Sequence, residues 1–191
     1  MAIGHEVMTV VHQTWIGEAS GPLILMPECL LTEWSGIDVP DYRSVVAQFR
    51  WNAKEPRACD YDRACDVSAP AGVIPVAFGQ GLVLSESLLP TTWLPRPWGG
   101  LLARWNYADS NDARDGALAR VPEALAWEAT EEFTVVDSPL TLFNSAEPGL
   151  DPVYPRLTIP SVAGPYRVRW AQYEPDDRTA FRIVELRSAA I

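Results

Sequence analysis

Histidine, the most common general base of enzymes, is nearly missing from this chain of 191 residues. Its two histidines, His5 and His12, both lie near the amino terminus, whereas a serine or cysteine nucleophile usually needs a histidine base beside it. No serine stands in a Gly-x-Ser-x-Gly sequence, the turn that exposes the nucleophile in many hydrolases. A catalytic triad is therefore not expected.

Cysteine is also scarce, and its three copies leave at least one thiol without a disulfide partner. The cysteines and histidines match no ligand spacing of a zinc site. The acidic run DYDRACD, residues 60–66, begins like a calcium loop but has Cys65 at the position of the loop's glycine and Ala71 at that of its closing glutamate. The sequence predicts no metal ion and no other cofactor.

Long hydrophobic runs are absent, and so is a basic amino-terminal segment followed by an apolar one. The longest apolar stretches, such as residues 22–27, fall far below the roughly 20 residues that span a bilayer. Together with the unpaired cysteine, this predicts a soluble cytoplasmic protein that makes no contact with a membrane.

Positive charge is in deficit, because 15 Lys and Arg residues stand against 25 Asp and Glu residues, a net charge of −10. Nucleic-acid binding depends mostly on lysine and arginine neutralising phosphates, so it is not expected here. The acidity would steer a basic partner toward the chain, although it also serves solubility alone in many proteins. Aromatic residues make up 10% of the chain, which is typical of a folded protein, and the length fits a single domain over residues 1–191.

Two segments resemble each other, GGLLARWNYADSNDAR from Gly99 and GPYRVRWAQYEPDDR from Gly164. Each has a glycine, an alternating stretch, Arg-Trp, an aromatic residue and an acidic turn that ends in arginine. A second pair is VIPVAFGQGLVLSE from Val73 and EFTVVDSPLTLFNS from Glu132. These pairs suggest an internal duplication whose halves would pair face to face around one core.

Short alternating segments separated by glycine and proline predict a mainly β, sandwich-like single domain with one or two short helices. The strands expected most clearly cover residues 73–76, 82–84, 101–107, 133–136, 140–143, 157–159, 166–173 and 180–186. A helical turn is expected in PECLLTEWSGI, residues 27–37, and residues 117–127 have the best helical composition, whereas residues 106–114 are predicted to be a polar loop. The proline-rich segment at 88–100 is expected to wrap the surface.

Acidic residues stand next to aromatic ones in three clusters, at residues 60–62, 107–115 and 173–177. Aromatic anchors rimmed by carboxylates are expected where a protein captures a positively charged protein surface. The alternative, that these are solvated loops at strand ends, stays open. Trp98, between Pro97 and Gly99, either presents its ring on a turn or plugs the end of the sandwich. The candidate partner-binding residues are Tyr61, Asp62, Trp98, Tyr107, Asp109 and Asp112.

The chain resembles the Immunity protein 21 family of bacterial polymorphic toxin systems, from about Trp15 to the carboxyl terminus. The segments that carry the resemblance are TWIGEASGPLILMPECLLTEWSG, DYDRACDV, GVIPVAFGQGLVLSESLLPTTWLP, GGLLARWNYADS and PLTLFNSAEPG. The resemblance implies a cytoplasmic, non-enzymatic protein that binds and neutralises a cognate toxin. A nuclease is the favoured toxin, because nuclease surfaces tend to be basic.

Two other functions stay open at this point. One is a β-sandwich module that binds a carbohydrate or another small ligand through exposed tryptophans. The other is a hydrolase that uses paired carboxylates in a cleft. The sequence leaves the oligomeric state undetermined.

Overall fold

The computed structural model describes residues 13–17, 21–37, 59–86, 89–150 and 153–189. In these ranges the strands form two five-stranded antiparallel sheets, which confirms the mainly β, sandwich-like prediction. The strands are β1 (Leu23–Pro27), β2 (Gly72–Val76), β3 (Gly79–Leu84), β4 (Thr91–Arg96), β5 (Gly99–Ala108), β6 (Glu128–Val135), β7 (Leu140–Asn144), β8 (Leu157–Ile159), β9 (Gly164–Asp176) and β10 (Thr179–Ser188). The helices are the short 3-10 helix η1 (Glu28–Glu33), α2 (Asp60–Cys65) and α3 (Asn111–Leu118).

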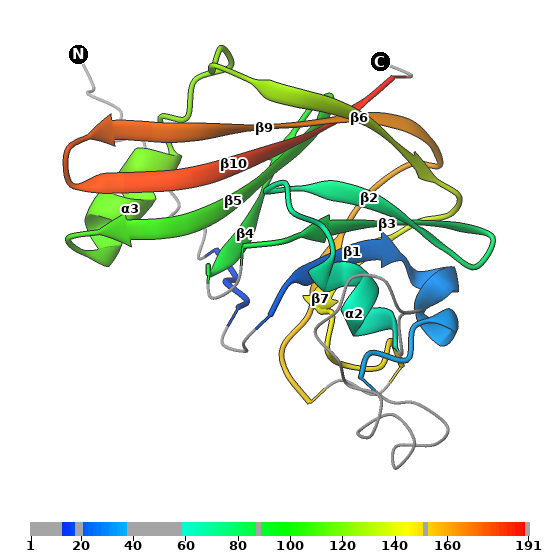
Figure 1. The fold of residues 1–191 in the computed structure, drawn as a ribbon. Helices are drawn as coiled ribbons and strands as arrows, with labels where there is room; N and C mark the ends of the chain where they lie inside the picture. Colours follow the sequence, from blue (N-terminus) through cyan, green and yellow to red (C-terminus); the bar gives the residue numbers. More distant parts are fainter. Residues whose placement is uncertain (1–12, 18–20, 38–58, 87–88, 151–152, 190–191) are drawn as a thin grey trace, which may run out of the picture.

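The strand order is β2-β3-β1-β7-β8 in the first sheet and β4-β5-β10-β9-β6 in the second (Figure 1). The main core lies between them, where Leu25 and Leu82 of the first sheet pack in one cluster with Leu102, Phe133 and Val184 of the second. All five side chains are fully buried. Strands that alternate apolar side chains can bury one face in this way, and this burial is the main stabilising contribution to the sandwich.

Side chains link the two sheets along the edge formed by β2, β3 and β6. Glu131 of β6 accepts a hydrogen bond from the backbone N–H of Val73 at 2.7 Å. In the other direction, the backbone N–H of Thr134 donates to Oε1 of Gln80 at 2.6 Å. Backbone donors at sheet edges would otherwise be open to pairing with another chain, so these bonds protect both edges.

The outer face of the second sheet carries a separate apolar cluster, called the outer cluster here. Alternation along β5 and β10 turns Leu101, Phe181 and Ile183 away from the main core and toward α3, which contributes Ala117 and Leu118. The second sheet is therefore buried on both faces over part of its area.

The position of α3 differs from the sequence prediction. The polar stretch at 106–114 was expected to be a loop, yet it contains the start of the helix, and residues 119–127 form no helix. Ser110 decides the start, because its hydroxyl accepts a hydrogen bond from the backbone N–H of Ala113 at 3.1 Å. Pro122 follows the helix and is incompatible with a helix centred on it.

The proline-rich segment does not simply wrap the surface, because residues 91–96 form β4. This strand lies at the edge of the second sheet, with Thr91, Thr92 and Leu94 buried. Proline lacks a backbone N–H, so Pro95 is tolerated at an edge, where one side of the strand needs no partner.

The two similar segments occupy equivalent places in one sheet rather than in two facing halves. β5 and β9 flank β10 and both run antiparallel to it. Gly99 and Gly164 open these strands with nearly equal φ angles of 134° and 137°. Trp105 nevertheless packs in the outer cluster, whereas Trp170 packs in the main core.

The second pair of similar segments has no common structure. Residues 73–84 form the hairpin β2–β3 within the first sheet, whereas residues 132–144 pass from β6 in the second sheet to β7 in the first. The expectation that duplicated halves pair face to face is therefore wrong.

A substitution at the two equivalent glycines is expected to have unequal effects. A Cβ at Gly99 would overlap the carbonyl oxygen of Leu186, whereas a Cβ at Gly164 would meet nothing within 4 Å. Both positions have a φ that strains any other residue, so we expect Gly99→Ala to lower the free energy of unfolding by about 2 kcal/mol and Gly164→Ala by about 1 kcal/mol. Urea denaturation measures both, and equal losses would contradict the predicted overlap.

Candidate functional site

Carboxylates gather at one end of the second sheet, on the left of Figure 1, where β5 leads into α3 and β9 turns into β10. The pairing of Thr179 with both Ala108 and Asp176 brings the two turns together. All of these carboxylate residues are exposed. We call this group the acidic end: Asp109, Asp112, Glu174, Asp176 and Asp177.

Tyr107 and Asp109 are directly accessible at the acidic end. Tyr107 is 48% exposed, a high value for an aromatic residue at a strand end. Asp109 forms an ion pair with Arg178 at 3.0 Å, and both side chains are largely exposed. Exposed pairs contribute little to stability, so this one could exchange for a pair with a partner at small cost. Asp112 lies in the first turn of α3, where the helix dipole favours its negative charge.

A group of packed side chains lies next to the acidic end and supports it. The guanidinium of Arg114 lies 4.5 Å from the ring centroid of Trp15 and 5.0 Å from that of Trp105. Arg114 also forms an ion pair with Asp115 at 2.7 Å. Asp115 is thus already paired with a cation. Asp112, three residues earlier, forms no ion pair within the described residues.

Tyr173 belongs to this group of packed side chains and not to the accessible surface. It is buried in the outer cluster, and its hydroxyl donates a hydrogen bond to the carbonyl of Ala117 at 3.2 Å. Burial raises the pKa of the Tyr173 hydroxyl. The contact ties β9 to the last turn of α3, so it fixes the helix that presents Asp112.

Tyr61 and Asp62 lie in α2, beside the first sheet and away from the acidic end (Figure 1). The backbone N–H of Tyr61 donates to the carbonyl of Gly36 at 3.2 Å, and burial, followed by a hydrogen bond with Cys65, raises the pKa of its hydroxyl to about 12. Asp62 accepts a hydrogen bond from the backbone N–H of Cys59 at 3.3 Å, which caps the helix. Both residues have a local structural role.

Trp98 lies in the turn between β4 and β5, at the other end of β5 from Tyr107. Its ring is half-buried and packs against the outer cluster, with the Arg187 guanidinium 4.1 Å from the ring centroid. The structure therefore brings Tyr107, Asp109 and Asp112 together and separates them from Trp98. Sequence analysis missed that Asp176 and Asp177 join them, although the matching acidic turns of the two similar segments carried the signal.

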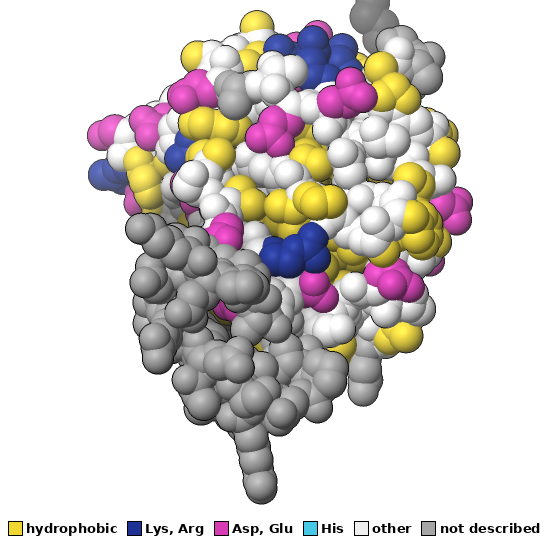
Figure 2. Space-filling view, turned by 45° about the vertical axis from the view of Figure 1, so that its right-hand side comes forward, with side chains coloured by type: hydrophobic (Ala, Val, Ile, Leu, Met, Phe, Trp, Pro, Cys, Tyr) yellow, Lys and Arg dark blue, Asp and Glu magenta, His cyan; other side chains and the backbone are white. Residues whose placement is uncertain are grey.

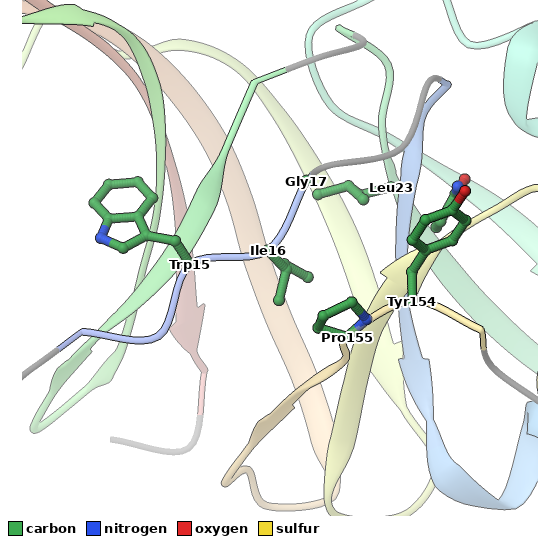
Figure 3. Close-up of a pocket in the computed structure, with 7 residues that line it drawn as sticks. Trp15, Ile16, Gly17, Leu23, Tyr154 and Pro155 are labelled. Atoms are coloured by element: carbon green, nitrogen blue, oxygen red, sulfur yellow. The ribbon is translucent and has the colours of Figure 1, made fainter.

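A small hollow near the N-terminal segment offers little room for a ligand (Figure 3). Its volume of about 20 Å³ would hold one or two water molecules, not a sugar or a nucleotide. In Figure 3 Pro155 and Ile16 lie between Tyr154 and Trp15, and the Trp15 ring points away from them. Among the described residues, no three or more His, Cys, Asp or Glu side chains are placed to hold a metal ion.

The family model described as Immunity protein 21 matches residues 14–179. The chain belongs to the Immunity protein 21 family. The match includes the whole turn from β5 into α3 and most of the β9–β10 hairpin, so both parts of the acidic end lie within the family region. No curated protein and no solved structure matches this immunity protein closely enough to count as similar. Within the described ranges, none of its helices has the length and apolar character of a transmembrane helix.

Proposed function

We propose that this Immunity protein 21 family member binds and neutralises a cognate toxin in the cytoplasm by protein–protein contact, without catalysing a reaction. The observation that carries the proposal is the acidic end, where five exposed carboxylates and one exposed aromatic residue, Tyr107, lie at the same end of the second sheet. Such an anchor with a charged rim is the arrangement expected of a protein-binding surface. Family membership supports the immunity role, and the acidic end supports the place of contact.

A toxin with a basic surface fits this site best, and a nuclease is the favoured class. A nuclease holds the phosphates of its substrate with cationic groups, and carboxylates placed against those groups would compete with the substrate. The net charge of −10 would speed the encounter over a distance, mostly at low salt. Inhibition then requires only that the acidic end occupies the cationic groups or blocks the path to them.

The burial of the tryptophan side chains favours protein contact over carbohydrate binding. Among the described residues Trp34 is buried, and the remaining tryptophans are half-buried against the two core clusters or the N-terminal segment. Stacking on a sugar needs an open ring face, and in these ranges no tryptophan is exposed enough to offer one. The small hollow near Trp15 adds no room for a ligand of that size.

Co-expression with the toxin domain encoded beside this protein tests the function. We expect cells that carry both proteins to grow, and a complex to co-purify at about 50 mM salt and to weaken at about 500 mM salt, because salt screens contacts between charged surfaces. Cells that express the toxin alone are the control. Failure of the wild-type protein to restore growth or to bind would contradict the proposed function.

A further inference from the structure

The outer face of the second sheet carries a row of arginines at the end of β10 opposite the acidic end. Residues aligned across neighbouring strands, from β4 to β6, are Arg96, Gly99, Arg187, Arg167 and Glu132. Leu94, two residues before Arg96, packs in the outer cluster, so alternation places this row on the outer face. We call Arg96, Arg167 and Arg187 the arginine row.

Glu185 is the next residue on the outer face of β10, toward the acidic end, and its carboxylate neutralises part of this positive charge. It is fully buried, and its two oxygens accept hydrogen bonds from Arg169 at 2.5 and 3.0 Å. Arg187 and Arg167 approach the same carboxylate at 3.3 and 3.5 Å. One carboxylate thus faces three guanidinium groups. With Arg96, and with Glu131 and Glu132, which line one hollow with Arg167, the region has four arginines against three glutamates. Positive charge exceeds negative charge here, in a protein with a net charge of −10.

Tryptophan rings hold two of these guanidinium groups in place. Arg187 lies 4.1 Å from the ring centroid of Trp98, and Arg169 lies 4.4 Å from that of Trp127. Arg167 and Arg187 are directly opposite each other on β9 and β10, a like-charge pair that repels. Their side chains remain 43% and 33% exposed, so their outward faces are open to solvent. Figure 2 shows arginine side chains, in dark blue, gathered at the top of the molecule, where Figure 1 places β6 and the C-terminal end of β10.

We propose that the arginine row is a second contact area for the toxin and takes carboxylate side chains of that protein. The proposal rests on the proposed function and adds the chemistry of a second part of the partner's surface. Fixed guanidinium groups bind carboxylates with paired hydrogen bonds, and a partner carboxylate would also relieve the repulsion between Arg167 and Arg187. Arginine and tryptophan are the residue types that contribute most at protein interfaces.

A nucleic acid fits this surface less well than a protein does. A polyphosphate would meet only a few arginines and would be repelled by the net charge of −10. A protein partner can instead place one or two carboxylates on the row while its basic surface faces the acidic end.

The two contact areas lie at opposite ends of β10, which fixes their separation. Thr179 begins β10 at the acidic end and Arg187 lies near its other end, so eight residues at about 3.3 Å each separate them by roughly 26 Å. The toxin would present basic groups and acidic groups at a matching distance. A partner that docks in reverse would meet like charges at both places, so the pair of areas selects one orientation.

Matched charge variants test the arginine row in a titration calorimeter with the purified cognate toxin domain. The double variant Arg96→Gln/Arg167→Gln removes two positive charges from the row and keeps Arg169 and Arg187 on Glu185. The control Arg63→Gln/Arg120→Gln also removes two positive charges, from one arginine in α2 and one that follows α3, and neither belongs to the arginine row or to the acidic end. We expect the first variant to raise the Kd at least about tenfold, and the control to leave it unchanged or to lower it.

The outcomes separate this inference from the proposed function. A Kd for Arg96→Gln/Arg167→Gln within about twofold of the wild-type value, or a loss equal to that of the control, overturns the arginine row and leaves the immunity role standing. A wild-type protein that forms no complex with the toxin overturns the proposed function and the arginine row with it.

Discussion

The triple variant Asp109→Asn/Asp112→Asn/Asp177→Asn is expected to associate with the cognate toxin at least about tenfold more slowly than the wild-type protein at low ionic strength. The three carboxylates are exposed at the acidic end, and within the described residues their one side-chain hydrogen bond is the exposed contact of Asp109 with Arg178. Their removal should therefore change the electrostatic attraction and leave the structure intact. Stopped-flow mixing at several salt concentrations measures the association rate, whose salt dependence should also weaken.

A control variant separates the position of the charges from their number. Glu33→Gln/Glu123→Gln/Asp137→Asn also removes three negative charges, from exposed residues outside the acidic end. Its association rate should stay within about twofold to threefold of the wild-type rate, because distant charges act only through the screened overall field. If both variants slow association equally, the acidic end is not the site of contact.

Removal of the Glu185 carboxylate is expected to destabilise the fold strongly. Glu185→Gln leaves Arg167, Arg169 and Arg187 facing one another around a buried neutral group. Loss of one partner of a buried ion pair typically costs 3–5 kcal/mol, and the partial exposure of these arginines favours the lower limit. We therefore expect the free energy of unfolding to fall by about 3 kcal/mol.

Urea denaturation of Glu185→Gln, with Glu132→Gln beside it, measures this loss. Glu132 is exposed on β6, which β9 separates from β10, so its replacement should change the free energy of unfolding by no more than about 0.5 kcal/mol. A Glu185→Gln variant as stable as the Glu132→Gln variant would show that the three arginines do not depend on the buried carboxylate.

The strands of the sandwich could be predicted because each depends on local alternation. The predicted strand at 157–159 coincides with β8, and the segment from 166 to 173 lies within β9. The position of α3 was missed because a single capping serine, Ser110, outweighed the better helical composition of the residues that follow Leu118. Composition over a window does not detect a signal carried by one side chain.

The candidate site was predictable only where its residues are neighbours in sequence. Tyr107, Asp109 and Asp112 stay together because they fall in one strand end and the helix that follows it. Asp177 joins them through the pairing of β5 with β10, which alternation along one segment does not determine. The arginine row is the extreme case, because Arg96, Arg167 and Arg187 come from three strands and meet only through their register.

The central claim, that the acidic end contacts the toxin, is tested most directly by mapping the contact on the protein itself. Backbone amide resonances of the ¹⁵N-labelled protein would be followed while unlabelled toxin domain is added. We expect the largest changes to fall on the turn from β5 into α3 and on the β9–β10 turn, which together carry Asp109, Asp112 and Asp177. Changes confined to α2 and the first sheet, with the acidic end unaffected, would contradict it.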